Sequence, residues 1–131
     1  MPEAEKVEKI TINLGVVDLG RIDLLVREGF FANRTDFIRT AVRNLLGASA
    51  QEINSTVARK TLVLGSIHHT KADLERLQAE GRQIDIRVLG LASIADDVTP
   101  DLARATIASI EVLGTLRAGA AVKAALRDRI V

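Results

Sequence analysis

Hydrogen-bonding side chains recur at every second position near the start of the chain: Lys9, Thr11 and Asn13. The positions that alternate with them are apolar: Ile10, Ile12 and Leu14. Strict alternation over this stretch is typical of a strand with one buried face and one solvent-facing face. The polar face would present donors and acceptors in a row, which is the chemistry of recognition by hydrogen bonds.

The chain offers few residues for catalysis or for metal binding. Its two histidines, His68 and His69, are adjacent, so on a strand they would point to opposite faces, and no third ligand is evident. Asp96 and Asp97 precede a helix start and are expected in a solvated turn. No glycine pattern matches a phosphate-binding loop, and no nucleophile has a base nearby. We therefore expect no catalytic residue, no metal site and no cofactor.

The alternating segment needs a partner, because a lone strand with one apolar face is not stable in water. Two helical patterns follow it directly, and no second strand pattern lies close enough to form a hairpin. The simplest partner is the same segment of a second copy, which gives an antiparallel ribbon across a two-fold axis. Such a ribbon fits the major groove of DNA. An ordinary solvent-facing edge strand is the other interpretation, but the two following helices favour the ribbon.

Two amphipathic helices are expected after this segment, over about 16–28 and 34–46, with Gly29 as the C-cap candidate of the first. Asn33 is a good N-cap for the second helix, Asp36 follows at the capping-box spacing, and Gly47 is expected to end the helix. Free backbone N–H groups over residues 34–36, together with the Arg34 side chain, could hold a DNA phosphate.

Residues 10–46 resemble the ribbon-helix-helix domain of the MetJ/Arc/CopG class. The matching segments are Ile10-Thr11-Ile12-Asn13-Leu14, Ile22-Asp23-Leu24-Leu25, Gly29 and Asn33-Arg34-Thr35-Asp36-Phe37-Ile38-Arg39. The resemblance implies an intertwined dimer on double-stranded DNA. In such a dimer the outward strand residues Lys9, Thr11 and Asn13 would contact base edges. The start of the second helix, Asn33, Arg34 and Thr35, would contact the phosphate backbone.

Composition restricts the remaining possibilities. The chain has 131 residues, 47% of them hydrophobic, with three Phe and no Trp or Tyr, so its core must be aliphatic. The absence of cysteine fits a reducing cytoplasm. No apolar run approaches the roughly 20 residues of a membrane span, so no membrane partner is expected. The net charge of +1 means that DNA contacts must come from a few placed groups.

A triplet repeat occupies the second half of the chain. Val-Leu-Gly occurs at 63–65, 88–90 and 112–114, with strand-like residues before each triplet and helical segments between them. Thr70 and Thr99-Pro100-Asp101 are the expected helix starts. A strand-plus-helix unit of this length loosely resembles leucine-rich solenoids. We expect a short parallel sheet in which the three valines share one row and the glycines mark strand ends.

These observations predict an α+β protein in four segments. They are a flexible N-terminus over 1–8, a ribbon-helix-helix domain over 9–47, a linking helix over 48–59 and a three-unit βα repeat domain over 60–131. The expected function is sequence-specific DNA binding by a cytoplasmic transcriptional regulator. We expect a homodimer, or a tetramer or higher oligomer, whose repeat domain serves oligomerisation or senses an effector of unknown identity.

Two other functions remain open. The chain could be an antitoxin that binds its operator and also a toxin, although antitoxin tails are usually disordered and polar, whereas residues 48–131 are apolar enough to fold. It could instead be a scaffold whose parallel sheets associate edge to edge.

Overall fold

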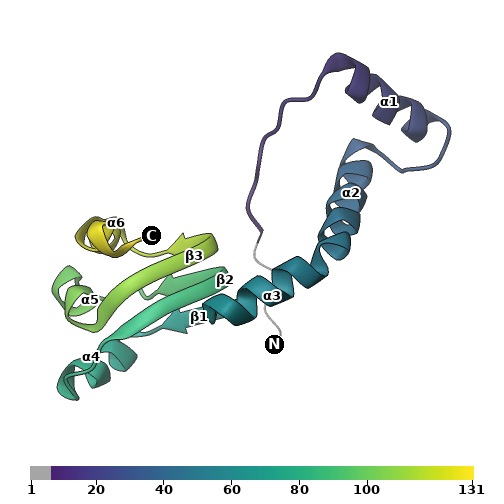
Figure 1. Ribbon diagram of the computed structural model, residues 1–131. Coiled ribbons are helices and arrows are strands. Elements are labelled where there is room, and N and C mark those ends of the chain that lie inside the picture. The colour runs from purple at the N-terminus through teal and green to yellow at the C-terminus, as the bar shows by residue number, and fades with distance from the viewer. Residues whose placement is uncertain (1–6) are drawn as a thin grey trace. The chain divides into compact units, whose positions relative to one another are not determined.

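The computed structural model describes residues 7–131. The chain divides into two compact units, Met1–Asn54 and Ser55–Val131. The first unit is helical and the second contains a three-stranded parallel sheet, which confirms the α+β class (Figure 1). Within the described residues, no helix is long and apolar enough to cross a membrane.

The first unit begins with an extended segment and continues into helices. Residues 7–15 have no regular secondary structure and run as an extended trace in Figure 1. The predicted strand is therefore unpaired in the single chain, since a strand is defined by the neighbour to which it bonds. The helices that follow are α1 (Val16–Arg27), α2 (Arg34–Ala48) and α3 (Ala50–Lys60), and α3 crosses the boundary between the units.

The ends of α1 and α2 follow the capping residues closely. Gly29 has a φ of 85°. Its N–H donates to the Val26 carbonyl, and the N–H of Phe30 donates to the Leu25 carbonyl, as in a Schellman motif. Asn33 caps α2, because its Oδ1 accepts from the Asp36 N–H at 2.8 Å.

Gly47 does not end α2, contrary to the prediction. The helix continues to Ala48, and only Ser49 separates it from α3. The N–H of Ser49 still donates to the Leu45 carbonyl, and the Ser49 carbonyl accepts from Ile53. A single glycine costs a helix about 1 kcal/mol, which is too little to end it when hydrogen bonding continues on both sides.

The second unit alternates strands with short helices. Its elements are β1 (Val63–His69), α4 (Lys71–Ala79), β2 (Ile84–Ile94), α5 (Pro100–Thr106), β3 (Ile107–Arg117), α6 (Ala120–Ala125) and a 3-10 turn (Arg127–Arg129). The sheet has the order β1-β2-β3, and both pairs are parallel. Both expected helix starts are confirmed, because the Thr70 and Thr99 side chains accept from the Asp73 and Leu102 N–H groups.

The three Val-Leu-Gly triplets are in register, as predicted. Val63 lies opposite Val88 and Val88 opposite Val112, and the leucines and glycines form the next two rows. The glycines lie inside the strands, however, so the expectation that they mark strand ends is wrong. Each strand continues past its glycine because the glycines permit a close approach between neighbouring backbones, as described below.

The helices cover one face of the sheet and create the core there. Fully buried core residues come from the strands (Ile86, Val88, Ala92, Ile107, Ile110), from α4 and α5 (Leu74, Ala103) and from the residue after α6 (Leu126). The leucines of the triplets lie outside this cluster. Alternation places them on the opposite face, which these helices do not cover.

Two details of the sheet concern the residues just before the valine row. Leu62 precedes β1 and is only 7% exposed, because the chain turns at Thr61 (φ 53°). Arg87 does lie opposite Glu111. The two side chains bond to Lys60 instead of to each other. The Arg87 guanidinium donates to the Lys60 carbonyl, and the Glu111 carboxylate pairs with the Lys60 ammonium at 3.1 Å.

Candidate nucleic-acid interface

The extended segment presents both its polar and its apolar side chains to solvent. Lys9, Thr11 and Asn13 are all exposed. The apolar row is also uncovered, with Ile10, Ile12 and Leu14 exposed by 80%, 53% and 41%. These three apolar side chains are therefore available for contact with another apolar surface.

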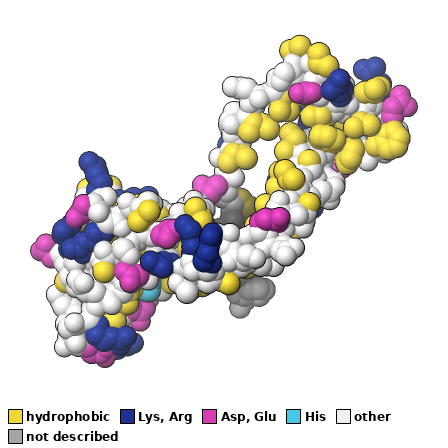
Figure 2. Space-filling model, viewed as in Figure 1, with side chains coloured by type: hydrophobic (Ala, Val, Ile, Leu, Met, Phe, Trp, Pro, Cys, Tyr) yellow, Lys and Arg dark blue, Asp and Glu magenta, His cyan; other side chains and the backbone are white. Residues whose placement is uncertain are grey.

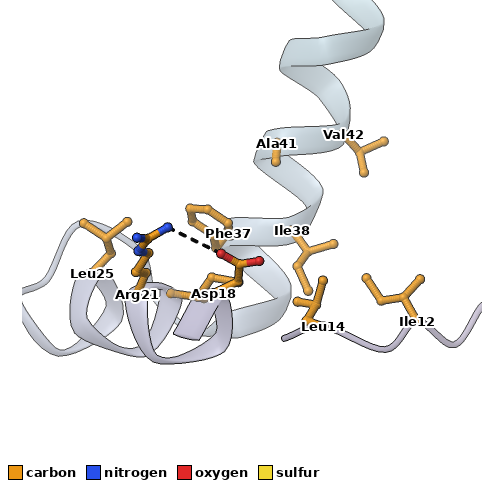
Figure 3. A pocket seen from close by; sticks show the side chains of 10 residues that line it. Ile12, Leu14, Asp18, Arg21, Leu25, Phe37, Ile38, Ala41 and Val42 are labelled. Carbon is orange, nitrogen blue, oxygen red and sulfur yellow. Dashed lines mark ion pairs between the residues drawn. The ribbon is translucent and has the colours of Figure 1, made fainter. Parts of the chain in front are cut away.

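A mostly apolar groove lies beside this segment in the first unit. It has a volume of ≈ 420 Å³ and is lined by Ile12, Leu14, Asp18, Arg21, Ile22, Leu25, Phe37, Ile38, Ala41 and Val42. In Figure 3 the side chains of Ile12 and Leu14 point toward the α2 side of this groove, where Ile38 and Val42 lie. The apolar row of the segment and the apolar stripe of α2 therefore border one surface.

The core of the first unit is very small. Ile22 is the one buried residue within the described part of this unit, and α2 has none over its 15 residues. The α2 side chains Val42, Leu45 and Leu46 are all exposed. Figure 2 shows hydrophobic side chains gathered over α1 and α2. Contiguous apolar surface of this kind marks an interaction site.

The turn between α1 and α2 is fixed by an ion pair and by an aromatic contact. Nε and Nη2 of Arg34 donate to the two carboxylate oxygens of Asp23 at 2.7 and 2.8 Å. The hydrogen bond from Arg34 holds the pKa of the Asp23 carboxyl below its usual range, and the same bond raises the pKa of Arg34. The rings of Phe31 and Phe37 meet edge to face, with their centroids 5.0 Å apart.

The predicted phosphate-contacting residues lie at the exposed start of α2. Asn33, Arg34 and Thr35 are all exposed. The Asp36 N–H is taken by the Asn33 side chain, so it is not one of the free donors that the sequence predicted. The N–H groups of Arg34 and Thr35 have no acceptor within the helix, since they belong to its first turn.

The contact between Arg34 and Asp23 was not predicted from the sequence. The two residues lie on different helices, so the periodicity of a single helix does not predict their contact. The only signal was the position of Asp23 on the polar side of α1.

The two histidines of the second unit have different surroundings. Nδ1 of His68 lies 2.6 Å from the Ser93 hydroxyl, and His69 is half-buried. Burial lowers the pKa of the His69 ring. Over residues 7–131, no group of three or more His, Cys, Asp or Glu side chains could hold a metal ion.

Comparison with known proteins bears on both units of the chain. A family model described as the ribbon-helix-helix transcriptional regulator family matches residues 5–123. The match spans the extended segment, α1, α2 and the whole of the sheet. No significant match was found among curated proteins or among solved structures.

Proposed function

Because the chain belongs to the ribbon-helix-helix transcriptional regulator family, we propose that it reads the major groove of DNA with a ribbon made by residues 9–14 of two copies. The exposed row Ile10, Ile12 and Leu14 carries this proposal. Pairing of two such segments turns both apolar rows toward the helices and both polar rows toward DNA. The family supports a DNA-binding regulator, and the ribbon is our account of how this chain performs that role.

The uncovered stripe of α2 supports a homodimer. A helix of 15 residues with no buried side chain gains little stability from its own unit. A second copy supplies apolar surface to Val42, Leu45 and Leu46, at about 25 cal/mol for each Å² removed from water. The same contact covers the groove beside Ile12 and Leu14, so that ribbon pairing and helix packing occur together.

The dimer contacts DNA through two sets of groups. Lys9, Thr11 and Asn13 face the base edges, where lysine donates to guanine and the amide of asparagine can bond adenine. At the start of α2 the free N–H groups and the helix dipole favour a phosphate. Arg34 can serve both neighbours, because two of its five donors bond Asp23 and the others remain for a phosphate oxygen.

Selection of bound fragments from random DNA, followed by sequencing, tests the proposal. We expect a short palindromic or repeated motif. Thr11→Ala and Asn13→Ala should each relax the motif at one position, with a loss of about 1–3 kcal/mol on the specific site for each good base contact. Asn54→Ala, which removes an exposed amide at the end of the first unit, is the matched control and should leave the motif unchanged.

Two results would count against this function. An unchanged motif in both the Thr11 and the Asn13 variant would exclude readout by the ribbon. No enriched motif with the natural chain would instead favour a scaffold protein.

A further inference from the structure

The row of glycines in the sheet allows neighbouring backbones to approach closely. Gly65, Gly90 and Gly114 have φ values of 127°, 138° and 120°, which other residues rarely adopt. A Cβ on Gly90 would lie 2.1 Å from the Gly65 carbonyl oxygen, and a Cβ on Gly114 would lie 2.1 Å from the Gly90 carbonyl oxygen. Each of these two glycines therefore makes room for the carbonyl of the preceding strand.

Gly65 has the same conformation without the same neighbour. It lies on β1 at the edge of the sheet, and no atom lies within 4 Å of the position that its Cβ would take. A Cβ at Gly65 would therefore meet no atom of the described chain, although its φ is one that favours glycine. Gly90 and Gly114 have similar φ values, and each of them lies against a glycine carbonyl of the neighbouring strand.

The opposite edge of the sheet offers that carbonyl. Gly114 lies on β3, is exposed and continues the row in which each glycine carbonyl faces the next glycine. We propose that β1 of one copy pairs with β3 of a second copy, in parallel and in the register of the sheet, so that Gly65 receives the Gly114 carbonyl. The occupant of each edge is thus another copy of this chain.

The side chains at both edges favour this pairing. β1 contains no Pro, Lys, Arg, Asp or Glu, which are the residues that usually prevent an edge strand from pairing. In the proposed register Val63 lies beside Val112, and Leu64 lies beside Leu113. Leu64 and Leu113 are 64% and 50% exposed in the single chain, so the contact covers apolar surface that nothing in the unit covers.

Residues 130 and 131 pair with β3 on the N-terminal side of the proposed contact. Ile130 forms a parallel bridge with Ile110, and the Val131 N–H donates to the Ile110 carbonyl at 2.8 Å. This bridge lies on the N-terminal side of Val112. An added β1 begins with Val63 opposite Val112, so the two neighbours occupy successive parts of the same edge.

The contact joins two different edges, so it leaves one edge free on each partner. Association of this kind produces rings or lines of copies rather than a closed pair. It goes beyond DNA recognition and does not depend on the ribbon. For a regulator that binds DNA, it provides a way to place several dimers on adjacent sites.

Disulfide trapping tests the register directly, because the natural chain has no cysteine. Ser66 of one copy would lie opposite Thr115 of the next. Within one chain these residues are separated by β2, about 9–10 Å apart, which is beyond the reach of a disulfide. We expect a mixture of full-length Ser66→Cys and Thr115→Cys to give a covalent dimer under mild oxidation. The double variant should give a ladder of larger species that reductant dissolves.

Three controls test the register of the contact, the pairing of β1 with itself and association without cysteine. A mixture of Ser66→Cys and Arg117→Cys is two residues out of register and should cross-link several-fold less, whereas equal cross-linking would overturn the proposal. Ser66→Cys alone should stay uncoupled, and a covalent dimer of it would indicate β1–β1 pairing instead. Sedimentation of the cysteine-free chain should show masses that grow beyond the dimer with concentration, and a constant mass would also overturn the proposal.

Discussion

Arg34 takes part both in the contact between α1 and α2 and in the proposed phosphate contact. Its bidentate bond to Asp23 joins α2 to α1, and its remaining donors face solvent at the start of α2. The Asp23 pKa lies below its usual value because of this bond. The stabilisation is therefore present above pH 3.8, the ordinary value, and is lost as the pH falls through the lower pKa of the folded state.

Asp23→Asn and Arg34→Gln should separate the two roles. Both variants lose the ion pair, so both should lower the melting temperature by a similar amount. Only Arg34→Gln should weaken binding to all DNA sequences alike and reduce the slope of log affinity against log salt by about one unit. Fluorescence anisotropy at several salt concentrations measures this slope. Equal slopes for the two variants would show that Arg34 does not contact a phosphate.

His69 should make the second unit sensitive to mild acid. Burial lowers its pKa, while the charge of Asp73 partly opposes this shift. The unfolded chain therefore binds a proton more readily than the folded chain. The contribution of His69 to the free energy of unfolding should be constant above pH 6.5. The free energy of unfolding should then decrease as the pH falls from that value toward the lower pKa of the folded state.

Urea denaturation between pH 7.5 and pH 5 tests this expectation. His69→Gln should flatten the pH dependence of the unfolding free energy. His68→Gln removes the neighbouring exposed ring and should retain most of the dependence. The same pH dependence in the natural chain and in His69→Gln would assign the acid sensitivity to another group.

Among the elements, β1 and β2 depend on the close approach at the glycine row. Gly65→Ala should cost roughly 1–3 kcal/mol, because it forces a non-glycine residue to a positive φ in open space. Gly90→Ala adds a contact at 2.1 Å with the backbone carbonyl of Gly65 and should cost distinctly more. Chemical denaturation at low protein concentration, where association adds little, compares the two. Equal losses of unfolding free energy in the two variants would mean that the backbones of β1 and β2 can move apart at Gly90 without destabilising the sheet.

At the scale of the whole molecule, the proposed homodimer should depend on the apolar row of the extended segment. Ile12→Asp would place a carboxylate where two copies meet, and burying an unpaired charge costs several kcal/mol. We expect loss of DNA binding together with separation of the N-terminal units. Sedimentation velocity and a DNA shift assay measure these two effects.

Thr11→Asp is the matched control for this experiment. It puts the same charge on the polar side of the segment, so it should leave pairing of the N-terminal units intact while it repels DNA. If Ile12→Asp binds DNA like the natural chain, the apolar row is not the interface between the two copies.

The folded second unit also bears on the antitoxin alternative. Residues 55–131 form a sheet with a continuous core rather than a polar tail. This gives no support to a toxin-binding segment that folds only on contact with its partner.

Features that depend on residues a few positions apart could be predicted from the sequence. Alternation over 9–14, the caps at Asn33, Thr70 and Thr99, and the resemblance to the ribbon-helix-helix family all follow from residue types and their spacing. The Val-Leu-Gly triplets also predicted the register of the sheet, because equal spacing brings equivalent residues of parallel strands side by side.

Features that depend on contacts between distant parts of the chain required the three-dimensional structure. The ion pair of Arg34 with Asp23 and the bridge of Ile130 with Ile110 each join separate elements, and the burial of Leu62 depends on the turn at Thr61. The glycines were visible in the sequence, but their role was not. Whether a glycine ends a strand or admits a neighbouring carbonyl depends on the strand beside it, and that neighbour comes from a distant part of the chain or from another copy.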